Sequence, residues 1–328
     1  MTEPRFHVCG IGNALMDVIA PVDDAFIDAH GCARGTMTLI DTPRAEALYA
    51  AMPPAKESSG GSGANTAAMA AALGSRVAYL GRVADDTLGT FFRHDIAAAG
   101  VTFPTAPLTG SLPTGRSLIL VTPDGQRTMN TYLGASTTFG PEQVDADVIA
   151  DAAILYLEGF LFDPPAAQEA FRAAAAIAHA HGRQVALSLS DPFCVGRHRE
   201  AFRALVSGHV DILFANEAEV TSLYETADFD EAAAWARADC ALAALTRSER
   251  GSVVLCGPET VEVAAEPTSV LDTTGAGDAY AAGFLAAFTA GRSLAQCGRL
   301  GSVAAAEVIS HYGARPERDL SGEMARLI

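Results

Sequence analysis

A short segment near the C-terminal end of the chain carries the residue types best suited to chemistry. Residues 272–278 read Asp-Thr-Thr-Gly-Ala-Gly-Asp and precede an apolar run of small residues at 279–290. A turn of this kind at the start of a helix aims unpaired backbone N–H groups at one point, where the peptide dipoles add partial positive charge. The segment therefore predicts an anion site formed by Gly275, Ala276 and Gly277.

Asp278 lies in the first turn of that predicted helix, beside the anion site. A carboxylate there can accept the proton of an alcohol that attacks a bound phosphoryl group. We expect the positive helix end to lower the pKa of Asp278, which keeps it ionised but makes it a weak base. Asp272 and Thr274 are assigned to the nucleotide side of the loop, Asp272 as a brace. The alternative is a structural turn in which Asp278 only complements the helix dipole.

Two further segments offer contacts to a hydroxyl-bearing substrate. Residues 59–65 form a glycine-rich stretch before a helix expected from about Thr66 to Leu73. In that stretch Gly61 allows close approach, while Ser62 and Asn65 can hydrogen-bond hydroxyls. Its register is not G-x-G-x-x-G, which disfavours a nicotinamide-dependent oxidoreductase. The alternative interpretation is a purely structural turn.

Asn13 and Asp17 directly follow the first predicted strand and are assigned to the substrate as well. A carboxylate among apolar neighbours needs donors, and a bound diol supplies two of them. A backbone turn is the alternative source of those donors.

Polar residues after two later strands are candidates for binding the nucleotide. Asn216 and Glu219 lie three apart on one helical face and could hold the water shell of Mg²⁺, although ordinary N-capping explains the asparagine equally well. Thr246, Ser248 and Gly251 belong to a loop that could offer hydroxyls and its two guanidinium groups to phosphates. That loop is also consistent with a plain polar surface loop.

Composition limits the possible partners. The 328 residues are 49% hydrophobic, enough for a substantial core, and carry a formal net charge of −17. This charge disfavours nucleic acid and anionic membranes as partners. The six cysteines show no CxxC pair, so we expect reduced thiols, no zinc and a cytoplasmic location. The N-terminus lacks the pattern of a secretion signal, and no apolar stretch is long enough to span a bilayer.

The elements that must position these residues alternate between short apolar strands and alanine-rich helices. Helices are expected at 164–181 and 231–239. The expected strands are 8–12, 77–81, 154–158, 185–190, 211–214 and 242–246. Because these strands are apolar throughout, the pattern predicts a parallel sheet covered by helices on both faces.

Two stretches, 13–41 and 114–132, alternate as strands do but have no helical partners. The second reads as a hairpin with its turn at 123–125. Strands outside the main sheet can form a lid, and Arg127 on the hairpin would reach the substrate phosphates when such a lid closes. Irregular surface hairpins and an ordinary exposed arginine are the alternatives.

Taken together, these motifs resemble the ribokinase/PfkB family of small-molecule kinases across nearly the whole chain. The segment 59–65 with residues 81–86 is similar to the first family signature, residues 272–278 with Gly283 to the second, and residues 216–219 to its N-x-x-E element. The resemblance implies a ribokinase-like, doubly wound, mostly parallel α/β sheet plus a small β-sheet lid. The implied core, with the ATP and catalytic site, comprises residues 1–12, 42–113 and 133–328, and the discontinuous lid over the acceptor comprises 13–41 and 114–132.

The same resemblance implies the reaction and its cofactors. The γ-phosphoryl group of ATP would pass to a primary alcohol with Mg²⁺ present, and some relatives also use a monovalent cation such as K⁺ near the anion loop. The expected partners are ATP and a small-molecule substrate, and the expected assembly is a monomer or homodimer.

Within the family the chain is most similar to the adenosine kinases, through residues 12–17, 158–160, 189–193 and 211–217. This implies that Asp17 and Asn65 bind ribose hydroxyls, that Phe160 packs on a purine, and that the 5′-hydroxyl of adenosine is phosphorylated to give AMP. Thr274 departs from the pattern, which often has Asn there. The apolar residues expected around the purine are Leu15, Met37, Leu39, Phe160 and Phe162.

Two other functions remain open on sequence grounds. A kinase for a free sugar or sugar acid, such as ribose, fructose or 2-keto-3-deoxygluconate, needs the same anion loop and base. A sugar acid would additionally require a cation close to Asp17. A ligand sensor without catalysis is the other alternative, and the intact Asp278 and its glycines argue against it.

Overall fold

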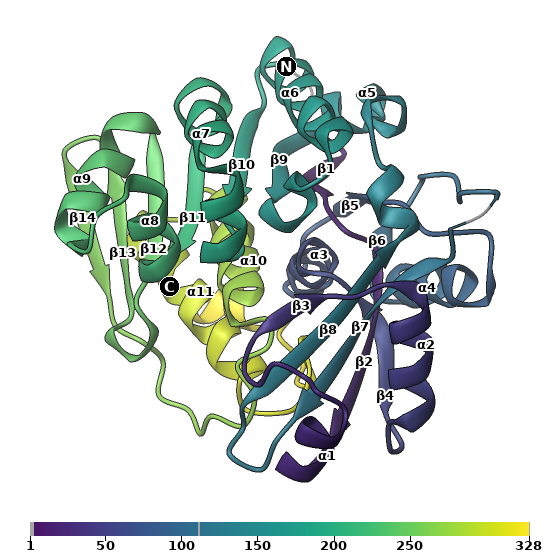
Figure 1. Cartoon of the computed structure of the whole chain (residues 1–328). Helices are drawn as coiled ribbons and strands as arrows, with labels where there is room; N and C mark the ends of the chain where they lie inside the picture. The colour runs from purple at the N-terminus through teal and green to yellow at the C-terminus, as the bar shows by residue number, and fades with distance from the viewer. Residues whose placement is uncertain (1–2, 111, 328) are drawn as a thin grey trace.

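The computed structural model describes residues 3–110 and 112–327, and across these residues the strands form two sheets (Figure 1). The large sheet has the order β14-β13-β12-β11-β10-β9-β1-β5-β6. Its strands are β1 (Phe6–Ile11), β5 (Val77–Leu80), β6 (Val101–Thr102), β9 (Ala152–Glu158), β10 (Gln184–Ser188), β11 (Ile212–Asn216), β12 (Leu242–Thr246), β13 (Ser252–Cys256) and β14 (Glu259–Val263). Pairing is parallel from β6 to β12, and β13 and β14 add an antiparallel edge.

Helices cover both faces of the large sheet. One face carries α5 (Ala146–Ala150), α6 (Pro165–Ala180), α7 (Pro192–His209), α8 (Glu217–Tyr224) and α9 (Phe229–Asp239). The other carries α3 (Ser62–Ala72), α4 (Thr87–Ala98), α10 (Ala276–Thr289) and α11 (Leu294–Val308). Along β9, Leu155 and Leu157 pack into the first layer and Ile154 and Tyr156 into the second. The predicted doubly wound α/β fold is therefore confirmed.

A small second sheet lies beside the carboxyl edge of the large one (Figure 1, lower right). In the order β3-β8-β7-β2-β4 it consists of β3 (Met37–Leu39), β8 (Arg127–Gly134), β7 (Thr114–Val121), β2 (Leu15–Pro21) and β4 (Lys56–Gly60). The helices α1 (Asp24–Ala29) and α2 (Thr42–Ala51) pack on its outer face, where Leu48 of α2 contacts Val18 and Leu118. Short 3₁₀ helices complete the chain: η1 (Ala135–Thr138), η2 (Pro141–Gln143), η3 (Gly159–Phe162), η4 (Ser248–Arg250) and η5 (Glu323–Leu327).

The composition of the small sheet corrects two sequence-based expectations. The prediction that residues 42–113 belong wholly to the core is wrong for 42–60, because α2 packs on the small sheet and β4 pairs with β2. The stretch 13–41 also contains α1, so it is not made of strands alone. The first error arises because the residues of 42–60 find their partners on strands far away in the sequence, which local patterns do not reveal.

The strand order places a crevice at the centre of the large sheet. From β1 the chain continues on one side to β5 and β6, whereas β9 and the later strands lie on the other. The polar residue Asn13 lies just beyond the carboxyl end of β1, and Glu158 is the last residue of the neighbouring strand β9. Ligands of doubly wound proteins bind at such reversals of strand order. In the described part of the chain, no helix has the length and apolar character needed to cross a membrane.

The helix α10, which carries the anion loop at its start, is held tightly against α11. A Cβ atom added at Gly283 of α10 would lie 2.5 Å from the carbonyl oxygen of Leu300 on α11. Because that neighbour is backbone, the two helices cannot keep this spacing with a larger residue. The glycine of the second signature thus sets the distance between the helices.

We expect Gly283→Ala to lower the free energy of unfolding by about 1–3 kcal/mol, because the added methyl group overpacks the contact between α10 and α11. Chemical denaturation of the purified protein measures the loss. Gly208→Ala near the end of α7 is the matched control, because a Cβ atom there meets no atom within 4 Å; it should be neutral or slightly stabilising. Equal stability of wild type and Gly283→Ala would contradict the proposed close packing.

Candidate active site

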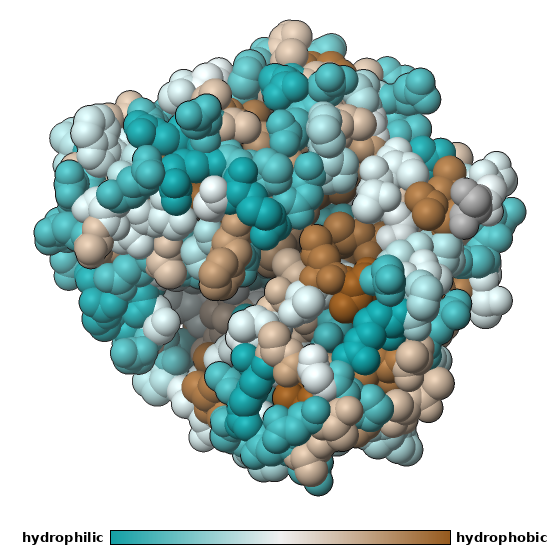
Figure 2. All heavy atoms as spheres, in the orientation of Figure 1, coloured by the Kyte–Doolittle hydropathy of each residue, from teal (hydrophilic) through white to brown (hydrophobic). Residues whose placement is uncertain are grey.

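A cavity of ≈ 960 Å³ separates the carboxyl edge of the large sheet from the inner face of the small sheet. Figure 2 shows a hollow in this region, near the middle of the face viewed, with apolar atoms along one side. Most of the residues predicted to form the site line this cavity: Asn13, Asp17, Gly61, Ser62, Asn65, Arg127, Phe160, Asn216, Glu219, Thr246, Ser248, Gly251, Thr274, Gly275, Ala276, Gly277 and Asp278. Asp272 is fully buried beneath it.

The N-terminus of α10 opens into the cavity. Gly275 precedes the helix with φ +77°, and a Cβ atom there would lie 2.5 Å from the side chain of Ala314, so this position requires glycine. The N–H of Ala276 makes a long turn hydrogen bond of 3.3 Å to the carbonyl oxygen of Thr273. Within the described residues, the N–H groups of Gly275 and Gly277 have no backbone acceptor. These two amides are therefore free to bind an anion.

Asp272 holds this loop in place from below. Its Oδ1 accepts hydrogen bonds from the backbone N–H (2.9 Å) and the hydroxyl (2.6 Å) of Thr274, and its Oδ2 accepts from the N–H of Gly313 (2.9 Å). The carboxylate thus joins the anion loop to the loop that follows α11. Its position is that of a brace, without access to the cavity.

Asp278 faces the residues of the glycine-rich segment. Its Oδ1 accepts a hydrogen bond from Ser62 Oγ at 2.6 Å and its Oδ2 a longer one from Asn65 Nδ2 at 3.4 Å. Burial raises the pKa of Asp278 above its ordinary value, and these bonds, with Arg127 and Arg315, only partly oppose the rise. The expectation of a lowered pKa is therefore wrong. Removal of water from the carboxylate outweighs the helix dipole, and the result is a stronger base.

Asp17 lies in a buried position on β2, packed against the backbone of Gly60. Burial raises the pKa of Asp17 to about 6, against the lowering effects of Arg315, the Gly61 N–H and the Asn65 amide. Asn65 also leaves its buried Oδ1 without a hydrogen-bond partner in the described structure. This acceptor and the Asp17 carboxylate are suited to bind the hydroxyl groups of a ligand.

Glu158 is a site residue to which the sequence reasoning gave no role. It is fully buried at the end of β9, and its Oε2 accepts the backbone N–H groups of Gly63 (2.6 Å) and Asn13 (3.1 Å), while Oε1 accepts Asn13 Nδ2 (2.9 Å). Burial raises its pKa to about 8. By capping α3 from a distant strand, Glu158 lets the helix begin at Ser62, earlier than the expected Thr66. The sequence signal that could have identified this site residue is a glutamate at the end of an otherwise apolar strand.

Arg127, at the start of β8, is half-buried at the cavity wall. Burial lowers the pKa of its guanidinium, and the charges of Asp272, Asp278 and Asp191 oppose this. A Cβ atom at Gly125, in the hairpin turn, would lie 2.8 Å from the carbonyl oxygen of Leu271, so the hairpin tip reaches the segment before the anion loop. The arginine thus lies among the carboxylates around the anion site.

The residues predicted to bind the nucleotide line the cavity, but Asn216 and Glu219 also bond to each other. Asn216 and Glu219 form a reciprocal capping box at the start of α8, with Asn216 Nδ2 bonded to Glu219 Oε1 at 2.6 Å. Burial raises the pKa of Glu219 to about 7. Both residues still line the cavity, as do Thr246, Ser248 and Gly251.

The two arginines of the loop after β12 do not point to the cavity. Arg247 lies 3.4 Å from Glu217 and over the ring of Phe229, and Arg250 also pairs with Glu217. The expectation that these guanidinium groups reach phosphates is therefore wrong, because a nearby carboxylate and an aromatic ring engage them.

The small sheet supplies an apolar wall to the cavity. Leu15, Met37 and Leu39 line it as predicted, and Phe160 lies on the large-sheet side. Ile119, Met129 and Leu133 extend this wall. Phe162 was wrongly placed there: its ring is buried against Phe171 and Phe202 under α6 and α7. Its spacing from Phe160 gave no sign that a 3₁₀ turn would send the two rings in different directions.

The cavity is strongly acidic. Its lining carboxylates are Asp17, Glu158, Asp163, Asp191, Glu219, Glu249, Glu266 and Asp278. Arg127 is the one cationic side chain among the described lining residues. No group of three or more His, Cys, Asp or Glu side chains in the described structure is arranged to hold a metal ion by itself. A polyanion therefore has the helix amides and Arg127 as direct partners, and a metal ion would have to share its ligands with the substrate.

Comparisons with known proteins agree with the observed fold. The sequence pattern of the pfkB family carbohydrate kinases matches residues 8–319. A solved structure of adenosine kinase from Sinorhizobium meliloti is 54% identical with TM-score 0.94, covering 99% of this chain and 100% of that one. A probable sugar kinase protein from Rhizobium etli CFN 42 is 52% identical with TM-score 0.94 and the same coverage.

A more distant relative also aligns over nearly its full length. The adenosine kinase of Saccharomyces cerevisiae is 28% identical over 332 residues, which cover 92% of this chain and 94% of the yeast protein. The segments that resemble the family signatures are the ones that form the free helix amides and the adjacent carboxylate in this fold. The chain belongs to the pfkB family of carbohydrate kinases, phosphotransferases that act on an alcohol group.

Proposed function

We propose that this kinase transfers the γ-phosphoryl group of ATP to the 5′-hydroxyl of a nucleoside, adenosine foremost. The observation that carries the proposal is the position of Asp278, held by Ser62 and Asn65 at the open N-terminus of α10, with the apolar wall of the small sheet across the same cavity. An apolar wall beside convergent polar groups suits a purine nucleoside.

The acceptor would bind at the end of the cavity formed by β2, β3, β7, β8 and the start of α3. Asp17 and the unpartnered Oδ1 of Asn65 would accept the ribose hydroxyls. Leu15, Met37 and Phe160 would enclose the base. The relatives named as adenosine kinases support this choice of acceptor.

ATP would bind at the other end, among the residues that follow β12 and those of α11. Thr246, Ser248 and Gly251 line that end, together with Ser302 and Ala306. The amides of Gly275 and Gly277 would bind the phosphoryl group in transfer, with Arg127 alongside. The electropositive end of α10 and the guanidinium of Arg127 would be the groups that bind phosphate in an otherwise acidic cavity.

A divalent cation such as Mg²⁺ fits the excess of carboxylates in the cavity. Asn216 and Glu219 would reach it through water, because their capping box occupies the side chains. The ion would neutralise phosphate charge. We also propose that a monovalent cation acts near the anion loop, which Asp272 joins to Gly313.

The chemical step then requires little of the protein beyond orientation. The acceptor oxygen attacks the γ-phosphorus in line, the bond to the bridging oxygen breaks, and ADP leaves with that electron pair. The proton of the hydroxyl passes to Asp278 as the new bond forms. The raised pKa of Asp278 makes this transfer more favourable than for an ordinary aspartate.

The competing acceptor class is a free sugar or sugar acid. A cation does lie near Asp17, since Arg315 interacts with its charge. The guanidinium of Arg315 is directed at the carbonyl oxygens of Ser59 and Ala64 and does not line the cavity, so it offers little to a substrate carboxylate. The apolar wall favours a nucleoside over a free sugar.

An acceptor screen tests the proposed function. ADP release from Mg-ATP is measured with adenosine, inosine, guanosine, cytidine, ribose, fructose and 2-keto-3-deoxygluconate. We expect adenosine to give the highest kcat/KM, because it fills both the polar and the apolar parts of the acceptor end. A higher value for a free sugar would reject the nucleoside assignment.

Asp278→Asn should lower kcat by at least about 10³-fold, roughly 4 kcal/mol of barrier, because the amide cannot accept the proton. Asparagine keeps the shape of the side chain, so nucleoside binding measured by calorimetry should change little. Turnover comparable to wild type would remove Asp278 from the role of base.

Asp17→Ala should raise KM for the acceptor by about 10-fold or more, through loss of hydrogen bonds to a charged group, while KM for ATP changes little. For wild type, acceptor affinity should fall as pH drops through about 6, the pKa of Asp17, because protonation removes an acceptor oxygen. Steady-state kinetics with each substrate varied separately measure both effects. A change confined to ATP would mean that the two ends of the cavity are assigned in reverse.

A further inference from the structure

Arg315 lies on the loop that follows α11, below the cavity and not among its lining residues. It makes hydrogen bonds in several directions. Nε donates to the carbonyl oxygen of Ser59 (3.0 Å), Nη1 to that of Ala64 (2.8 Å), and Nη2 to Ser59 Oγ (2.9 Å) and also to the Ser59 carbonyl. These bonds span the junction at which β4 ends and α3 begins. The junction contains Gly61 and Ser62, two of the cavity residues.

The charges around Arg315 are mainly negative. Asp17 on β2, Asp95 on α4 and Asp278 on α10 act on it, together with the Tyr79 hydroxyl on β5. Asp95 accepts hydrogen bonds from the N–H (2.7 Å) and hydroxyl (2.6 Å) of Ser59, so it holds the same residue as Arg315 from another side. The charged groups that act on Asp17 are Arg315, which favours its ionised form, and Asp278, which opposes it.

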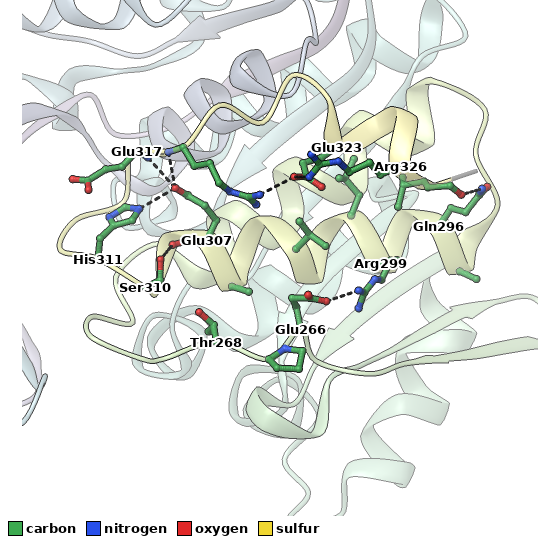
Figure 3. A pocket seen from close by; sticks show the side chains of 17 residues that line it. Glu266, Thr268, Gln296, Arg299, Glu307, Ser310, His311, Glu317, Glu323 and Arg326 are labelled. Carbon is green, nitrogen blue, oxygen red and sulfur yellow. Dashed lines mark hydrogen bonds and ion pairs between the residues drawn. The ribbon is translucent and has the colours of Figure 1, made fainter.

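Two buried carboxylates fix the loop that carries Arg315. Glu307 of α11 is 7% exposed, and its Oε1 accepts the backbone N–H groups of Glu317 (2.9 Å) and Arg318 (3.0 Å), with His311 Nε2 at 3.2 Å. Figure 3 shows Glu307 between His311 and the segment of Glu317, at the edge of a second cavity of ≈ 990 Å³. On the other side of Arg315, the N–H of Gly313 is bonded to Asp272.

A continuous set of contacts therefore connects the anion loop to the acceptor end of the cavity. Asp272 braces the anion loop and Gly313, and Arg315 two residues later holds Ser59 and Ala64. The acceptor end is thereby positioned relative to the anion loop by a residue that touches no substrate. Arginine suits this task, because its planar guanidinium can bond several acceptors at once and stays charged when buried.

We propose that Arg315 is a positioning residue for the acceptor: its guanidinium fixes the β4–α3 junction and places a positive charge on the same side of the acceptor site as Asp17. The proposal rests on the proposed function, since it takes Asp17 to bind acceptor hydroxyls. Its effect is specific to the acceptor and leaves the binding of ATP unchanged.

The test compares wild type with Arg315→Met and Arg315→Lys. Acceptor binding is measured by calorimetry without ATP between about pH 5.5 and pH 8, using whichever acceptor wild type phosphorylates best in the screen. ATP binding is measured separately without the acceptor. Arg318→Met is the matched control, because it removes a guanidinium three residues away whose partner is Glu323. Thermal unfolding of each variant separates a structural loss from a change in binding.

We expect Arg315→Met to weaken acceptor binding by about 10-fold or more near pH 6.5, and to move the acid limb of the binding profile up by about one pH unit or more. Without the guanidinium, Asp17 takes up a proton at higher pH, so affinity is lost earlier as pH falls. Arg315→Lys keeps the charge but loses the planar set of bonds. It should therefore bind more weakly with the acid limb close to that of wild type.

The outcomes distinguish the two proposals. A wild type that prefers a free sugar overturns the nucleoside assignment, while the comparison of variants proceeds with that sugar. An unchanged acid limb and affinity in Arg315→Met, or equal effects in Arg318→Met, overturns the role of Arg315. If Arg315→Met does not fold, Arg315→Lys decides the question. A folded Arg315→Lys that loses affinity at a higher pH than wild type would also overturn the role of Arg315. Equal weakening of ATP and acceptor binding would indicate a merely structural residue.

Discussion

The buried carboxylate of Asp272 is the constraint on which the active site depends. Its two oxygens bond Thr274 and Gly313, so it joins the anion loop to the loop after α11. Breaking either bond would leave a buried charge incompletely paired, which is costly in the protein interior. The loop therefore stays in the conformation that requires glycine at 275 and leaves two amides of α10 open to the cavity.

The acidic lining of the cavity and the burial of Asp278 have opposite consequences for the proposed reaction. The lining carboxylates repel a bare polyphosphate, so the proposed binding of phosphate would rest on the helix amides, Arg127 and a metal ion brought with the nucleotide. Removal of water from the cavity also raises the pKa of Asp278, which strengthens it as a base. In the proposed reaction the acidic lining thus hinders phosphate binding, whereas the burial of Asp278 favours the proton transfer.

In the proposed function, the small sheet gives the site its selectivity for the acceptor. Its strands turn Val18 and Leu118 toward the outer helices and Ile119 and Met129 toward the cavity, as the alternation of side chains along a strand requires. One thin layer thereby serves as a packed structural element and as an apolar wall of the cavity, the wall proposed to enclose the base. Such a wall can vary in sequence without disturbing the anion loop, which lies on the other element of the fold.

Local sequence patterns were sufficient for the parts of this protein that depend on short-range physics. The seven residues 272–278 specify a helix start with open amides, because backbone geometry and glycine content act within one turn. Apolar strands alternating with helices specified the doubly wound sheet. The hairpin around 123–125 was equally local.

Other features were decided only by tertiary contacts. The Ser62–Asp278, Gly63–Glu158 and Ser59–Arg315 bonds join residues 216, 95 and 256 positions apart. The pKa of Asp278, the early start of α3, the place of β4 and α2 in the small sheet, and the turning of Phe162 away from the cavity all depend on such partners. Burial and electrostatics are properties of the assembled surroundings of a side chain, and no window of sequence contains those surroundings.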